Sequence, residues 1–105
     1  MATNRLEILK QMIDSDPENS FARYGLAMEY SRSGNYAEAV SEFETLLAKD
    51  SDYAAAYFHY GQALEKMGDV EAARTAYERG IEVTTQKGDS HARGELEAAL
   101  SLLPV

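Results

Sequence analysis

Apolar residues recur along this chain every three or four positions, which is the spacing of one face of an α-helix. The chain has few Val, Ile and Thr runs bounded by turns, so its pattern does not predict strands. We therefore expect an all-α fold. Four apolar stripes carry this pattern: Leu26, Ala27 and Tyr30; Tyr36, Ala39, Phe43, Leu46 and Leu47; Tyr57, Tyr60, Gly61 and Leu64; Val70, Ala73, Tyr77, Gly80 and Ile81.

Glycines separate these stripes at places where a helix can end. Gly34 and Gly68 each follow a stripe and can adopt the left-handed conformation that closes a helix. Asn35 and Asp69 come next and can cap the following helix, and Glu38 suits a capping box with Asn35. The pattern predicts that one helix ends at each glycine and that a second helix begins just after it, with a tight turn between the two.

Two further capping signals lie outside these pairs. Pro17, which follows Asp16, has the residue type favoured at the first position of a helix. Near the end of the chain, Asp89 or Ser90 can cap a last helix that carries the apolar stripe Leu96, Leu100 and Leu103.

The sequence also repeats itself with a period of 34 residues. Self-similarity at such a period is the mark of a repeat architecture, in which each unit buries its apolar face against its neighbours. Identical or similar residues pair at this offset: Ala22 with Ala56, Tyr24 with Phe58, Ala27 with Gly61, Arg32 with Lys66, Gly34 with Gly68, Asn35 with Asp69, Ala39 with Ala73, Phe43 with Tyr77, Glu44 with Glu78 and Leu47 with Ile81.

Within each block, the order of residues resembles the tetratricopeptide repeat. That family has a large apolar residue followed by a small one on the first helix, a glycine turn, and then Ala, an aromatic and a small or apolar residue on the second helix. The two blocks read Leu26-Ala27, Tyr30, Gly34-Asn35-Tyr36, Ala39, Phe43, Leu46 and Tyr60-Gly61, Leu64, Gly68-Asp69-Val70, Ala73, Tyr77, Gly80.

The resemblance implies an α-solenoid of about six antiparallel helices in a single domain, 1–105. We expect a leading helix over 3–15, repeats over 20–53 and 54–87, and a capping helix over 88–103. The leading segment, with Leu6, Leu9 and Ile13, is similar to the second helix of a further unit.

The chain departs from the family pattern at a few positions. The family's opening tryptophan is Arg23 in the first block and Tyr57 in the second. The proline that usually closes a unit is Ser51 and then Thr85. These departures bear on helix ends and outer packing, while the fold assignment stands.

In this family the first helix of each pair lines a concave groove that binds a segment of another protein. Small residues at Ala27 and Gly61 are expected where the two helices of a pair approach closely. The resemblance implies that the outward face of each first helix, with one residue from the tail, forms a peptide-binding surface: Phe21, Tyr24, Met28, Arg32, Ala55, Phe58, His59, Gln62, Lys66 and Arg93.

The residue types on this predicted surface favour an apolar or aromatic partner segment, extended or helical. Most positions where a carboxylate-gripping subtype has Lys, Arg or Asn are aromatic, small or apolar here, so we expect no carboxylate clamp. Tyr24 and Phe58 are equally consistent with ordinary core packing, whereas Phe21 and Met28 better fit a solvent-facing patch. His59 is interpreted as a groove or spacer residue.

Charge and composition exclude several functions. The 105-residue chain has a net charge of −8 and no cysteine. An acidic surface repels phosphate backbones and anionic membranes, so we expect neither nucleic acid nor membrane as partner. No metalloprotease, phosphate-loop or nucleophile-elbow motif is present, so we expect no enzyme activity, no catalytic residue, no metal and no cofactor.

Two functional hypotheses remain. The first is a cytoplasmic adaptor or scaffold that binds a partner protein through the groove. The second is self-assembly into a homo-oligomer, such as a homodimer, through the terminal helices. The leading helix has apolar residues on more than one side, including Ile8 and Met12, and the tail adds Leu100, Leu102 and Leu103.

Overall fold

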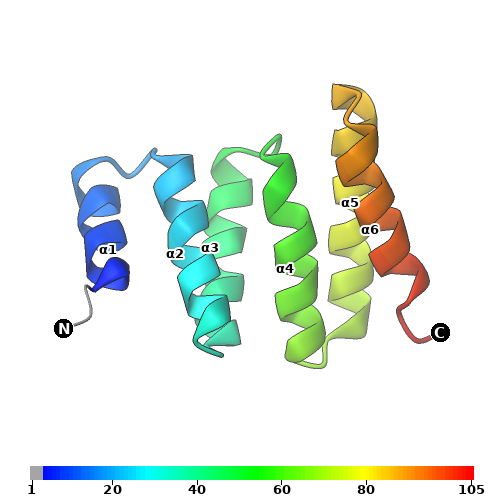
Figure 1. The fold of residues 1–105 in the computed structure, drawn as a ribbon, viewed down its shortest axis with the longest axis horizontal. Coiled ribbons are helices and arrows are strands. Elements are labelled where there is room, and N and C mark those ends of the chain that lie inside the picture. The colour runs from blue at the N-terminus through cyan, green and yellow to red at the C-terminus, as the bar shows by residue number, and fades with distance from the viewer. Residues whose placement is uncertain (1–3) are drawn as a thin grey trace. The chain divides into compact units, whose positions relative to one another are not determined.

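The computed structural model describes residues 4–105, and this part of the chain contains six α-helices and no strand (Figure 1). The all-α prediction and the predicted number of helices are confirmed. Thr3, the first residue of the predicted leading helix, lies outside the described residues. The helices are α1 (Arg5–Ser15), α2 (Ser20–Arg32), α3 (Tyr36–Lys49), α4 (Ala54–Lys66), α5 (Val70–Lys87) and α6 (Ser90–Ser101).

These helices form two compact units, which divide between Ser51 and Asp52. The first unit contains α1, α2 and α3, and the second contains α4, α5 and α6. Within each unit, consecutive helices run antiparallel (Figure 1). The predicted repeat limits at 20–53 and 54–87, and the interpretation of the chain as one domain, stay predictions.

The glycine turns fold as the sequence predicts. Gly34 and Gly68 have φ angles of 79° and 82°, in the left-handed region that favours glycine. After each glycine, the next backbone N–H bonds back across the turn: Asn35 donates to the Tyr30 carbonyl and Asp69 to the Leu64 carbonyl, at 2.8 and 2.9 Å. This pattern satisfies carbonyls that the end of the helix would otherwise leave unpaired.

The predicted caps hold at Asp69 but not at Asn35. The Asp69 carboxylate accepts a hydrogen bond from the Ala72 N–H at 3.1 Å. Asn35 occupies the equivalent place before α3, yet its side chain makes no cap bond. Its backbone N–H is already bonded to Tyr30, so Glu38 has no amide there to accept from. The predicted capping box is therefore wrong.

The predicted role of Pro17 is also wrong. Residues 17 and 18 lie in a turn, where the Asp16 carboxylate accepts from the Glu18 N–H at 3.2 Å. Helix α2 begins only at Ser20, because the Asn19 side chain accepts from the Ala22 N–H at 3.0 Å and caps the helix there. At the other end of the chain, Asp89 caps α6, as predicted, by accepting from the Ala92 N–H.

In the first unit, α2 packs against both α1 and α3. Its core contains Leu9 and Ile13 of α1, and the ring of Phe43 on α3 has no exposed surface. Where the family has tryptophan, Arg23 points toward α3 and forms an ion pair of 2.9 Å with Glu42. Both side chains of this pair are largely buried.

In the second unit, α5 packs against both α4 and α6. The α4–α5 contact is tight at Gly61, where an added Cβ would lie 2.2 Å from Cε1 of Tyr77. The predicted reason for a small residue at Gly61 is confirmed. Gly80 has a similar place on α5, since its Cβ would lie 2.6 Å from Cβ of Tyr57 and 3.0 Å from Cδ1 of Leu96.

Candidate functional site

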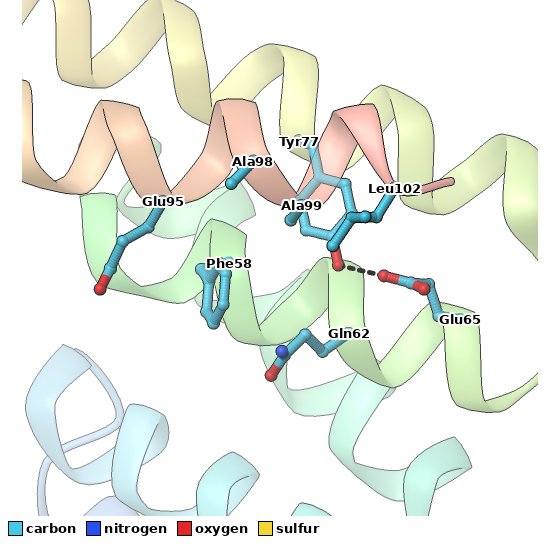
Figure 2. A pocket seen from close by; sticks show the side chains of 8 residues that line it. All are labelled: Phe58, Gln62, Glu65, Tyr77, Glu95, Ala98, Ala99 and Leu102. Carbon is cyan, nitrogen blue, oxygen red and sulfur yellow. Dashed lines mark hydrogen bonds between the residues drawn. The ribbon is translucent and has the colours of Figure 1, made fainter. Parts of the chain in front are cut away.

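The second unit has a surface depression between α4 and α6, with a volume of about 410 Å³ (Figure 2). We call it the α4–α6 depression. Phe58, Gln62 and Glu65 line it from α4, and Tyr77 lines it from α5; α6 and its end contribute Glu95, Ala98, Ala99 and Leu102.

Helical spacing explains why α4 presents its three lining residues together. Phe58, Gln62 and Glu65 are four and three positions apart, so their side chains lie on one face of the helix. The side of the depression formed by α6 projects little into it, because Ala98 and Ala99 have only methyl side chains (Figure 2). Two small residues facing a large ring leave the space that forms the depression.

Leu102 forms an apolar edge of the depression where α6 ends. Its exposed fraction is 84%. The chain that follows it is held in place: Leu103 is buried, and the Arg74 guanidinium donates to the Pro104 carbonyl at 2.9 Å. Leu102 is thus fixed at the surface by neighbours that are anchored to the unit.

Tyr77 crosses from α5 to α4 beneath this surface. Its ring occupies the space that Gly61 leaves on α4, and its hydroxyl donates to Oε2 of Glu65 at 2.5 Å (Figure 2). Burial raises the pKa of the Tyr77 phenol well above its ordinary value, and the hydrogen bond and negative charge of Glu65 raise it further. The phenol is therefore a neutral donor that fixes the position of Glu65.

A smaller depression of about 150 Å³ adjoins the same helices. It shares Phe58 and Glu95 with the larger one, so the Phe58 side chain borders both. His59 lies beside it, with its ring edge-on to that of Phe58 at a centroid distance of 5.3 Å. The remaining lining residues are Ala54, Ala55, Asp89, Ala92 and Leu96.

The charged side chains that line the α4–α6 depression are all acidic. Glu65 and Glu95 lie at its opposite ends (Figure 2). Neither Lys nor Arg is among the lining residues. His91 lies 3.5 Å from the Glu95 carboxylate and balances its charge only when protonated.

The structure brings together four of the six site residues that the sequence predicts in the second unit. Phe58 and Gln62 line the larger depression, and Ala55, Phe58 and His59 line the smaller one. Lys66 is exposed but lines neither. Arg93 also lines neither depression, and it forms an ion pair with Glu97 at 3.2 Å.

In the first unit, the four predicted residues differ in exposure. The Phe21 side chain is 72% exposed, as expected of a solvent-facing residue, whereas Met28 is half-buried. Tyr24 is half-buried, with its ring edge-on to Phe43 at 6.4 Å. Arg32 is exposed and paired with Glu29.

The two readings of Tyr24 and Phe58 are both partly correct. Each ring packs on the second helix of its own pair, Tyr24 on Phe43 and Phe58 on Tyr77, at centroid distances of 6.4 Å. Each ring also keeps part of its surface exposed. These aromatics are therefore core residues on one side and surface residues on the other.

Sequence reasoning missed most of the α6 wall. The tail was interpreted as a cap, with Arg93 as its one site residue, whereas α6 contributes Glu95, Ala98, Ala99 and Leu102 to the depression. The useful signal was their helical spacing of three, one and three, which places them on one side of α6.

The described residues contain no candidate metal centre. Within residues 4–105, no group of three His, Asp or Glu side chains is placed to hold a metal ion. The helices in the same range also include none with the length and hydropathy needed to cross a membrane.

Comparison with known proteins agrees with the repeat that the sequence displays. The family model described as tetratricopeptide repeat matches residues 24–91. A TPR repeat-containing protein of Pseudomonas aeruginosa is 29% identical over 98 residues, which cover 93% of each chain. A heat-shock cognate co-chaperone of Aspergillus fumigatus is also 29% identical, over 92 residues, and the match spans 88% of this chain but 27% of the co-chaperone.

Solved structures confirm the fold. The solution structure of a tetratricopeptide repeat domain protein from Salinibacter ruber has 36% sequence identity and a TM-score of 0.75, over 81% of this chain and 86% of that one. The family match covers well over half of the sequence, and the helix pairs turn at the predicted glycines. The chain therefore belongs to the tetratricopeptide repeat family, whose fold is a scaffold for protein–protein interaction.

Proposed function

We propose that this chain is a non-catalytic interaction module that binds an apolar or aromatic-containing segment of a partner protein. On the second unit, the segment contacts the α4–α6 depression. The observation that carries this proposal is the depression itself: about 410 Å³ of surface space, bordered by the exposed parts of Phe58 and Leu102. Apolar surface that is held open to water gains free energy when a partner covers it.

Two further observations support a binding role. A relative that matches 88% of this chain with 27% of its own length is named as a heat-shock protein cognate co-chaperone. The depression also combines a rigid aromatic ring with the amide of Gln62, which can hydrogen-bond the backbone of an extended segment. In the first unit, Phe21, Tyr24, Met28 and Arg32 remain the proposed contact residues.

A random 12-residue peptide library displayed on phage provides the test. Peptides enriched on the wild-type chain are synthesised, and their dissociation constants are measured by fluorescence anisotropy. We expect apolar or aromatic consensus residues and a loss of affinity of about tenfold or more for Phe58→Ala, since central aromatic contacts are worth about 1–2 kcal/mol or more.

The matched control is Met67→Ala. Met67 is a large apolar residue that is 51% exposed, and it lines neither depression. Its replacement should leave peptide affinity unchanged. The proposal fails if no peptide is enriched, or if enriched peptides bind Phe58→Ala as tightly as wild type. The double variant Phe21→Ala/Met28→Ala tests the first unit's residues in the same assay.

Self-assembly is the alternative function, and the exposed apolar residues of α1 favour it. Ile8 and Met12 are 48% and 39% exposed, while Leu9 and Ile13 on the same helix are buried within the unit. One side of α1 thus packs on α2 and the other presents apolar surface.

Light scattering over a concentration series tests self-assembly. A dimer that Ile8→Glu converts to monomer, without effect on peptide binding, supports it. A wild-type chain that stays monomeric up to high concentration rejects it. Ile8 serves better than Leu102 here, because Leu102 also lines the α4–α6 depression.

A further inference from the structure

We infer that the α4–α6 depression selects partner segments in which an apolar residue is flanked by Lys or Arg. This inference rests on the proposed function and specifies the partner's chemistry. Its basis is the arrangement of an apolar centre, formed by Phe58, Ala98, Ala99 and Leu102, between the carboxylates of Glu65 and Glu95 (Figure 2).

The apolar centre fits one side chain of medium to large size. Space exists there because two alanines face the Phe58 ring, and Leu102 is held at the open edge. A Leu, Met or Phe side chain inserted between Phe58 and Leu102 would remove apolar surface of both from water. Burial of this kind supplies affinity without selecting for charge.

The two carboxylates provide the selection by charge. Glu95 keeps 54% of its side chain exposed, so its carboxylate is accessible to a partner, and its neighbour within ion-pair distance is His91. Glu65 is held by the Tyr77 hydroxyl, a neutral donor that leaves the negative charge in place. A segment with basic residues on both sides of its apolar residue would place a cation near each carboxylate.

Acidic partners are disfavoured at the same surface. The lining residues include no cation to receive a carboxylate, and the chain as a whole carries a net charge of −8. Arg93, a basic residue of α6, is paired with Glu97. Like charges brought together at an interface reduce affinity and slow association.

A set of three synthetic peptides tests the inference. Each has the same central leucine and the same length, and the two flanking residues on either side are all Lys, all Gln or all Glu. Anisotropy titrations at pH 8 and low salt should give affinities in the order Lys, Gln, Glu. Exposed ion pairs contribute about 0.2–1 kcal/mol each, so two of them predict a Lys preference of about two- to thirtyfold over Gln.

Glu95→Gln and Glu97→Gln form a matched pair of variants. Both remove one charge from α6, but Glu97 does not line the depression. Glu95→Gln should lower the preference for Lys over Gln flanks by up to about fivefold, and added salt should lower it in the wild type. Glu97→Gln should leave the preference intact.

The outcomes separate this inference from the proposed function. If all three peptides bind equally and lose affinity with Phe58→Ala, the chain binds apolar segments but does not select basic flanks, and the inference is overturned. Equal loss of preference in both glutamine variants also overturns it, since a general charge effect would explain the data. If none of the three peptides binds while a library-selected peptide does, the inferred preference for an apolar residue with basic flanks is wrong. If no peptide of any kind binds, the proposed function fails as well.

Discussion

The two helix pairs of this chain, α2–α3 and α4–α5, differ in the residue types through which the helices of each pair pack on one another at equivalent positions. In the second pair, Gly61 leaves room for the ring of Tyr77. The residues 34 positions earlier are Ala27 and Phe43, both with no exposed surface. A methyl group replaces a hydrogen on one helix, and the ring on the other helix lacks a hydroxyl.

The Tyr77 hydroxyl is a donor and therefore needs a hydrogen-bond acceptor on α4. Tyr77 donates to Glu65, whereas the residue 34 positions before Glu65 is Ser31. The Ser31 hydroxyl oxygen is buried without a hydrogen-bond partner in the described part of the chain. The second pair thus gains a charged residue that is positioned at its surface. The first pair has a small polar residue at the same place.

The position of the family's tryptophan shows a second difference. In the first pair, Arg23 forms a largely buried ion pair with Glu42. In the second, Tyr57 is buried, and Gly80 allows α5 to approach its Cβ closely. Leu46, which stands 34 positions before Gly80, is buried and brings a full side chain to the corresponding place on α3. One pair joins its helices there by charge and the other by close packing.

The largest expected effect comes from filling the space that Gly61 leaves in the second pair. Gly61→Leu should lower the free energy of unfolding by about 2–3 kcal/mol, because the new side chain meets the buried Tyr77 ring. Urea titration followed by circular dichroism measures the change. Hydrogen exchange should show the loss of protection in α4, α5 and α6.

Gly94→Leu is the matched control for that substitution. Gly94 lies within α6, and an added Cβ there would have no neighbour within 4 Å. The change should leave stability equal or raise it slightly, since glycine is unfavourable inside a helix. If Gly61→Leu is as stable as wild type, the close approach of α4 and α5 is not as described.

A smaller effect is expected from breaking the ion pair of the first unit. Glu42→Ala leaves the Arg23 guanidinium largely buried without its carboxylate and should cost about 1–2 kcal/mol. Glu38→Ala, on an exposed position of the same helix, is the control and should cost less than about 0.5 kcal/mol. Equal melting temperatures for the two variants would show that the pair does not stabilise the α2–α3 contact.

The periodic part of the fold is predictable from sequence. Apolar spacing identified the helices and most of their buried residues, and Gly34 and Gly68 marked the turns because few other residues adopt positive φ. Caps were less predictable. Asn19 caps α2 where Pro17 suggested an earlier start, and Asn35 makes no cap although its type and position favour one.

The candidate site was only half predictable, for a different reason. Helical spacing shows that Phe58 and Gln62 share a face of α4, but it does not show which helix lies opposite. The wall of α6 and the bond between Tyr77 and Glu65 join residues that are at least 12 positions apart. Such pairs depend on tertiary packing, so a sequence that repeats every 34 residues gives no hint of a feature present in only one repeat.

The smallest effect, and the sharpest test of the comparison, is expected from Tyr77→Phe, which gives the second pair the ring of the first. Loss of the bond to Glu65 should cost about 0.5–1.5 kcal/mol at pH 7.

Because the pKa of Tyr77 is raised by folding, the contribution of Tyr77 to stability is fully present below about pH 10. It is lost as pH rises further, when the unfolded phenol ionises before the folded one. The stability difference between wild type and Tyr77→Phe, measured by urea titration, should therefore narrow above that pH. Glu65→Gln keeps an acceptor for the hydroxyl but removes the negative charge. The loss of stability of this variant at alkaline pH should therefore lie between the losses of wild type and of Tyr77→Phe. A difference that stays constant from pH 7 to the alkaline range would mean that the hydroxyl is not held by Glu65, and the two helix pairs would then differ in shape alone.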